Sequence, residues 1–235
     1  APITSERLNF WAASSDRPKE WFLCGSALSS EDKYMMVKFA SMCGAAVCKS
    51  WNPSVTHVIA ATDEKGACTR TLKVLMAILS GKWILTIDWI KACIRENYPV
   101  NEEPYEVSLD NHGCLGGPKA GRLRASSNAP KLFDGLKFYL TGDYVPAYKN
   151  DLLDLVEKAG GSIIHTKEQL QATSSACLVV YNTDPPHGCA FEESSNVLLQ
   201  RLAKAEELAK PIGCQVVQHT WILESIATCK LVLFC

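Results

Sequence analysis

Apolar residues along the chain fall into two alternating patterns from residue 21 onward. Short continuous apolar runs predict buried strands, and apolar positions that recur every three or four residues predict helices that cover them. In the first half, strands are predicted over 21–24, 45–48, 56–60 and 83–86, and helices over 31–43, 71–79 and 88–95. Because the sequence between these strands lacks two-residue hairpin turns, the pattern indicates a parallel sheet with helices on both faces.

The same order of elements returns after residue 131. Strands are predicted over 138–140, 162–165, 177–181 and 215–217, and helices over 151–158, 196–210 and 221–228. The segments 83–90 and 215–222 correspond most clearly, since each places a strand, a short turn and then a Trp at the start of a helix. The sequence therefore contains an internal repeat of about 100 residues.

The repeat predicts a domain organisation in four parts. Residues 1–20 form an N-terminal leader, 21–107 the first repeat, 108–130 a linker and 131–235 the second repeat, with an insertion at about 182–210. The linker is rich in Gly, Ser, Asn and Pro and is locally basic, which predicts an exposed segment. The insertion is predicted as a loop followed by an amphipathic helix that Ser194 or Ser195 caps and whose apolar stripe packs against the repeat.

Composition narrows the function classes. The 235 residues carry a formal net charge of −1, so no global basic field favours duplex DNA as a partner. No apolar run reaches the length of a membrane span, and residues 1–20 have no signal-peptide core. None of the eleven cysteines forms a C-x-x-C pair or a zinc pattern, which favours buried thiols in a reducing compartment and predicts neither metal nor cofactor. His57, between Thr56 and Val58, is predicted to be structural.

The turn after the first strand is a candidate anion site. The segment 25–32 reads Gly-Ser-Ala-Leu-Ser-Ser-Glu-Asp, in which Ser29 or Ser30 can cap a helix that begins with Glu31 and Asp32. The Ser26 hydroxyl and the Ala27 N–H then lie where a strand meets a helix, a place that favours negative charge. On this stretch alone, the alternative is that Gly25 and Ser26 form only a tight turn and Ser29 only a cap.

Several motifs together resemble the tandem BRCT (breast-cancer C-terminal) family. They are the Gly25-Ser26 turn, Val55-Thr56-His57-Val58, Arg70-Thr71-Leu72-Lys73, Gly81-Lys82-Trp83-Ile84-Leu85 and Trp89-Ile90-Lys91-Ala92-Cys93. The resemblance covers about residues 21–235 and is to the repeat pairs of RING-type ubiquitin ligase subunits, in particular those of plants. It implies an α/β fold in which two BRCT repeats, each a four-stranded parallel sheet flanked by helices, pack head to tail.

The resemblance also implies a site for a phosphorylated serine. In the family a hydroxyl, the next backbone N–H and a lysine hold the phosphate, and these correspond here to Ser26, Ala27 and Lys73. Ala27 stands where glycine is usual, so it can serve if its φ is negative, whereas a positive φ would leave the pocket strained or closed. A groove between the repeats takes the side chain three positions after the phosphoserine. Its residues correspond to Arg70, Thr71, Leu75, Ala147, Tyr148 and Leu223.

The second repeat is not expected to hold a second phosphate, because Asp143 follows its Thr141-Gly142 turn and would repel one. The family resemblance implies a non-catalytic module of a nuclear DNA-damage-response or chromatin protein that binds a phosphorylated protein or histone peptide. It further implies a parent protein in a RING ubiquitin ligase complex that forms a heterodimer through a domain outside this chain. No membrane and no sequence-specific DNA partner is expected.

Two other function classes compete with this one. The first is a reader of ubiquitylated nucleosomes that does not depend on the phosphate pocket and uses Lys119, Arg122 and Arg124 on the acidic histone surface. The simpler interpretation of these three side chains is a solvated linker. The second is an enzyme, which the absence of nucleotide-binding, nucleophile-elbow and zinc motifs argues against.

Overall fold

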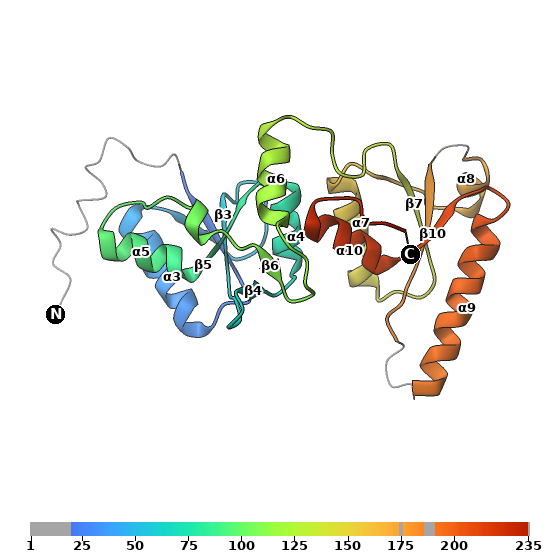
Figure 1. Ribbon diagram of the computed structural model, residues 1–235, viewed down its shortest axis with the longest axis horizontal. Helices are drawn as coiled ribbons and strands as arrows, with labels where there is room; N and C mark the ends of the chain where they lie inside the picture. The colour runs from blue at the N-terminus through green and yellow to red at the C-terminus, as the bar shows by residue number, and fades with distance from the viewer. Residues whose placement is uncertain (1–19, 174–175, 186–190, 235) are drawn as a thin grey trace. The chain divides into compact units, whose positions relative to one another are not determined.

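The structure is a computed structural model that describes residues 20–173, 176–185 and 191–234 (Figure 1). The chain divides between Ala129 and Pro130 into two compact units, with Ala227–Cys229 assigned to the first unit. Each unit is described by itself. The predicted leader, apart from residue 20, lies outside the described residues.

The first unit contains the predicted parallel sheet. Its strands are β1 (Phe22–Ser26), β2 (Ala46–Cys48), β3 (His57–Ala60) and β5 (Trp83–Thr86). They lie in the order β2-β1-β3-β5, and every neighbouring pair is parallel. Two short strands, β4 (Ala67–Cys68) and β6 (Leu109–Asp110), form a separate parallel pair.

Helices cover both faces of this sheet, as the alternation of strands and helices predicted. Figure 1 shows α3 (Ser30–Cys43) and α5 (Ile87–Glu96) on one side of the sheet and α4 (Leu72–Leu79) on the other. Successive residues of a strand point to opposite faces, so Leu23 packs in the core under α3 and α5 while Cys24 packs in the core under α4. A short 3-10 helix, η1 (Glu103–Tyr105), follows α5.

The prediction of an exposed linker is wrong for residues 117–126. These residues form α6 (Gly117–Ser126), which packs against α4 and β5. Gly121 makes the contact possible, because a Cβ at this position would lie 2.2 Å from the carbonyl oxygen of Ile78. The helix carries few apolar side chains, so the pattern that identified the other helices is missing here, and close backbone packing takes the place of an apolar stripe.

The second unit repeats the sheet of the first. Its strands are β7 (Lys137–Thr141), β8 (Ser162–Ile163), β9 (Cys177–Tyr181) and β10 (Gln215–Gln218). The order β8-β7-β9-β10, again parallel throughout, matches β2-β1-β3-β5 of the first unit strand for strand. The structure therefore confirms the internal repeat and the α/β fold class.

The helices of the second unit differ from the predicted bounds. They are α7 (Pro146–Lys158), α8 (Lys167–Gln171), α9 (Phe191–Ala209) and α10 (His219–Thr228). Pro146 starts α7 about one turn earlier than predicted, and α9 begins at Phe191, so the predicted cap positions 194 and 195 lie inside this helix. The predicted apolar stripe of α9 packs as expected, since Ala205 is buried against β9.

Candidate functional site

The carboxyl end of β1 carries the first predicted phosphate ligand. Ser26 is the last residue of β1 and is buried, and its Oγ lies 2.7 Å from Oγ1 of Thr71. Thr71 is the N-cap of α4, where its Oγ1 also accepts a hydrogen bond from the Val74 N–H. This pair of hydroxyl groups therefore fixes the end of β1 to the beginning of α4.

Ala27 has a left-handed backbone conformation, with φ at 53°. The residue is exposed, and its N–H makes no hydrogen bond within the part of the chain that the structure describes. A negative φ was the condition for an unstrained pocket, so this turn is strained, at a cost of about 1–3 kcal/mol. Non-glycine residues held in this region occur preferentially at functional sites.

Lys73 extends from α4 to the ends of two strands. Its ammonium donates to the carbonyl oxygens of Gly25, at 2.8 Å, and of Lys49, at 3.0 Å. Burial raises the pKa of the neighbouring Cys24 thiol, while the charge of Lys73 acts in the opposite direction. The structure thus brings together Ser26, Ala27 and Lys73 at one edge of the sheet, the edge at which open α/β sheets bind ligands.

Arg70, predicted to contact a peptide backbone, is held within the first unit. Its side chain is only 5% exposed, with Nε donating to Asp110 Oδ2 at 2.6 Å and Nη2 to Cys114 Sγ at 3.0 Å. Burial acts to raise the pKa of Asp110. The hydrogen bonds from Arg70 and from the N–H groups of Cys114 and His112 outweigh this effect, so the pKa lies below its ordinary value.

The remaining groove residues lie in both units. Leu75 is buried in α4 of the first unit. In the second unit, Ala147 is exposed in the first turn of α7, Tyr148 follows it, and Leu223 is partly buried in α10. The Tyr148 ring stands edge-on to His219 at 5.7 Å, and burial raises the pKa of its hydroxyl to about 12. The groove that would join these residues stays a prediction.

The three basic residues of α6 have different surroundings. Arg122 forms a bidentate pair with Glu106, with donor–acceptor distances of 2.6 and 2.7 Å, and its guanidinium lies 3.6 Å from the centre of a Trp83 ring. The hydrogen bond to Glu106 raises the pKa of Arg122 further. Lys119 is exposed and Arg124 partly buried. Arg122 therefore helps to hold α6 against the rest of the first unit.

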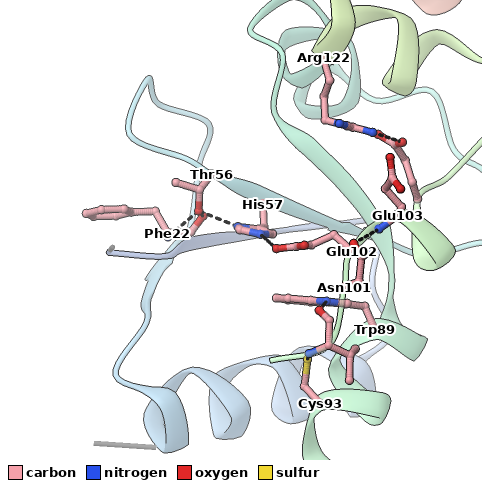
Figure 2. Close-up of polar contacts among 11 residues, drawn as sticks. Phe22, Thr56, His57, Trp89, Cys93, Asn101, Glu102, Glu103 and Arg122 are labelled. Carbon is pink, nitrogen blue, oxygen red and sulfur yellow. Dashed lines mark hydrogen bonds and ion pairs between the residues drawn. The ribbon is translucent and has the colours of Figure 1, made fainter. Parts of the chain in front are cut away.

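His57 begins β3, as predicted, and belongs to the core. Figure 2 shows its ring between Thr56 and Glu102, with Nδ1 2.8 Å from Thr56 Oγ1 and Nε2 3.5 Å from a Glu102 oxygen. The ring also stacks on Trp89, with centroids 5.1 Å apart. The contact with the His57 side chain lowers the pKa of Glu102. These contacts fit the structural role expected of this histidine.

The second unit has a different arrangement at the equivalent strand end. Thr141 ends β7, and Gly142 follows with φ at 100°. The Asn182 side chain donates to the Asp143 carbonyl at 2.6 Å, and Arg201 Nη1 donates to the carbonyls of Asn182 and Asp184 at 3.2 and 2.7 Å. Asn182 thus binds the turn after β7, and Arg201 binds the segment that follows β9.

The sequence did not indicate the carbonyl groups that hold Lys73. No side-chain pattern marks a carbonyl acceptor, although the parallel pairing of β1 and β2 would have placed residues 25 and 49 at one edge. Within the described residues, no three His, Cys, Asp or Glu side chains lie close enough to hold a metal ion. The same residues contain no helix with the length and hydropathy needed to cross a membrane.

Comparison with known sequences gives similar proteins over most of the chain. A plant "BRCA1-associated RING domain protein 1" from Arabidopsis thaliana is 55% identical over 221 residues, which are 91% of this chain and 31% of that protein. The "Protein BREAST CANCER SUSCEPTIBILITY 1 homolog" from the same plant is 44% identical over 92% of this chain and 22% of its own length. The chain thus spans about a third or less of these relatives.

Solved structures with low sequence identity share the fold. The Brc1 BRCT5-BRCT6 domains of S. pombe have a TM-score of 0.56 at 18% identity, covering 90% of this chain and 94% of that one. A complex of Rtt107p with a phosphorylated histone has a TM-score of 0.54 at 12% identity, covering 96% and 95%. The family model described as BRCA1 C Terminus (BRCT) domain matches residues 21–94, and a second BRCT domain model matches 131–233. BRCT repeats are generally non-catalytic protein-interaction modules, and this chain belongs to the BRCT family as a tandem pair.

Proposed function

We propose that the chain binds phosphoserine-containing peptides and that Ser26, Ala27 and Lys73 of the first unit hold the phosphate. The observation that carries this proposal is the meeting of the Lys73 ammonium, the Ser26 hydroxyl and the N–H of the exposed Ala27 at the end of β1. The strained φ of Ala27 supports it, because strain persists where a function requires the conformation.

The chemistry of the three groups suits a phosphate monoester. A phosphoserine carries about −1.5 to −2 charges and three strong acceptor oxygens. When the Thr71 hydroxyl donates to Ser26, the Ser26 O–H is free to donate to a phosphate oxygen. The Ala27 N–H and the third N–H of Lys73 supply two further donors, one of them charged.

A second determinant is proposed in the groove between the repeats, formed by Arg70, Thr71, Leu75, Ala147, Tyr148 and Leu223. Arg70 donates hydrogen bonds from Nε to Asp110 and from Nη2 to Cys114, and its Nη1 makes no hydrogen bond to another described residue. This nitrogen is the donor we assign to the peptide backbone. The groove would select the residue three positions after the phosphoserine.

The relatives set the proposed biological context. Proteins named for the breast-cancer susceptibility protein and its RING-domain partner are similar to this chain, which supports a nuclear role in the DNA-damage response or chromatin. We further propose that the parent protein forms a heterodimer within a RING ubiquitin ligase. The complex of Rtt107p with a phosphorylated histone supports a phosphorylated histone tail as one ligand class.

Titration with a phosphoserine peptide library and its unphosphorylated counterpart tests the pocket. Wild type should bind only phosphorylated peptides, and Lys73→Ala should weaken that binding about 10- to 150-fold, as expected for a lost charged hydrogen bond. The matched control is Lys91→Ala, which removes an exposed lysine of α5. Thermal melting must show that both variants fold. Equal binding by wild type and a folded Lys73→Ala variant would exclude the assignment.

Nucleosome binding that does not use the phosphate pocket is the alternative function. Its proposed basic contacts are Lys119, Arg122 and Arg124, of which Lys119 is exposed and Arg122 is paired with Glu106. A nucleosome pull-down with Lys119→Ala and Arg124→Ala together, compared with Lys73→Ala, separates the two functions. Loss of nucleosome binding only in the α6 double variant would favour this alternative.

A further inference from the structure

The three proposed phosphate ligands leave part of the hydrogen-bonding capacity and part of the negative charge of a phosphate unmatched. Two of the three N–H groups of the Lys73 ammonium are bonded to the carbonyls of Gly25 and Lys49. One Lys73 N–H, the Ser26 hydroxyl and the Ala27 N–H remain for three phosphate oxygens that each accept more than one hydrogen bond. A single ammonium also leaves about half to one unit of the phosphate charge without a partner.

Lys49 lies beside the candidate phosphate site. Its carbonyl oxygen is 3.0 Å from the Lys73 ammonium, so its backbone forms part of the wall beside the pocket. The residue directly follows β2, whose Cys48 pairs in register with Cys24 of β1. Its side chain is exposed, and its ammonium makes no hydrogen bond or ion pair with any other described residue.

The other nearby cation, Arg70, is not available for this role. Arg70 lies three positions before Lys73, and its guanidinium is held by the buried carboxylate of Asp110. Its positive charge is therefore neutralised within the fold. Lys49, in contrast, has a flexible stem and three unengaged donors, and its charge can move to meet the ligand.

We infer that Lys49 is a specificity-determining residue of the candidate pocket, where its ammonium pairs with the second negative charge of the bound phosphate. This inference rests on the proposed phosphoserine-binding function and extends it to the charge of the ligand. It explains how a site with one engaged lysine distinguishes a phosphoserine from a singly charged carboxylate side chain.

The test is titration of Lys49→Gln and Lys49→Glu with one phosphoserine peptide and with the same peptide carrying glutamate in place of the phosphoserine. Lys49→Gln should weaken phosphopeptide binding about two- to fivefold at low salt, the range of an exposed ion pair. Lys49→Glu should weaken it about tenfold, since it replaces attraction by repulsion. Both effects should shrink at high salt and be smaller for the glutamate peptide.

Lys91→Gln is the matched control, because it removes an exposed lysine from α5, which lies on the opposite face of the sheet from α4 (Figure 1). Phosphopeptide affinities that are equal for wild type and both Lys49 variants would overturn this inference and leave the phosphoserine function intact. Failure of wild type to bind any phosphopeptide would instead overturn the proposed function, on which the inference rests.

Discussion

The carboxyl ends of β1 and β7 occupy equivalent places in two sheets of identical strand order, yet their polar groups are arranged differently. At the end of β1, a lysine ammonium and an exposed N–H lie beside Ser26. At the end of β7, Asp143 follows Gly142 and its carbonyl is bound by Asn182, and Arg201 binds the carbonyls of Asn182 and Asp184 in the segment after β9. The same strand arrangement therefore supports a candidate anion site in the first unit and a set of hydrogen bonds to backbone carbonyls in the second.

The comparison shows that the strand arrangement alone does not create a ligand-binding site. Parallel pairing brings strand ends to one edge in both units, but the residues at that edge decide whether donors are available to a ligand. The two arginines nearest these edges show the same principle. Arg70 is neutralised by the Asp110 carboxylate, whereas Arg201 donates to two uncharged carbonyls.

Removing the carboxylate that holds Arg70 should have the largest effect. Asp110→Asn leaves a guanidinium buried without its counter-charge, so we expect a loss of about 3–5 kcal/mol in the free energy of unfolding. Urea denaturation measures this loss. Asp88→Asn, which breaks an exposed pair with Lys91, should cost less than about 1 kcal/mol. Equal effects of the two variants would show that the Arg70 pair contributes no more than a surface contact.

The same pair predicts a pH dependence. Because the pKa of Asp110 is lowered in the folded chain, its contribution is present above the ordinary aspartate pKa of about 4 and is lost as the pH falls through the lowered value. Wild type should therefore lose stability more steeply below about pH 4 than Asp110→Asn does. Parallel stability curves for the two proteins across this acidic range would contradict this prediction.

The arginine of the second unit should matter less. Arg201→Met keeps an apolar stem near Gly142 and removes the guanidinium, so we expect a loss of about 1–3 kcal/mol from two hydrogen bonds with a charged donor. Phosphopeptide affinity should not change. Lys204→Met, at an exposed position of the same helix, is the control and should leave stability unchanged. A loss of phosphopeptide binding in Arg201→Met would place ligand contacts at the second strand end.

The sequence predicted the sheets well because strands and covering helices leave a strong apolar pattern. Both parallel sheets and the repeat were predicted, and of the two predicted caps of α3, Ser29 and Ser30, the structure has Ser29, which accepts the Asp32 N–H at 3.1 Å. The helix α6 was missed because Gly121 packs backbone against backbone, which leaves no apolar period to detect.

The candidate site was predicted only in part. Ser26 and Lys73 were identified through the family motif. The structure shows that they lie close together, because Ser26 bonds to Thr71 at the start of α4 and Lys73 bonds to the carbonyl of Gly25. The carbonyl acceptors of Lys73 and the buried partner of Arg70 depend on contacts between residues far apart in the chain. A single sequence gives no signal for such contacts. Only the structure shows which acceptors the donors of Lys73 and Arg70 bond to.

The smallest expected effect comes from the turn residue at the end of β1. Ala27→Gly removes the strain of a positive φ and should raise the free energy of unfolding by about 0.5–1 kcal/mol, with phosphopeptide affinity within about twofold of wild type. The contrasting variant is Gly142→Ala at the end of β7, which should lower stability, because a side chain is strained at a φ of 100°. Paired urea denaturation measures both changes. A stability loss in Ala27→Gly would mean that the methyl group of Ala27 stabilises the turn by more than its φ costs, and the strain would then not mark this end of β1 as the functional one.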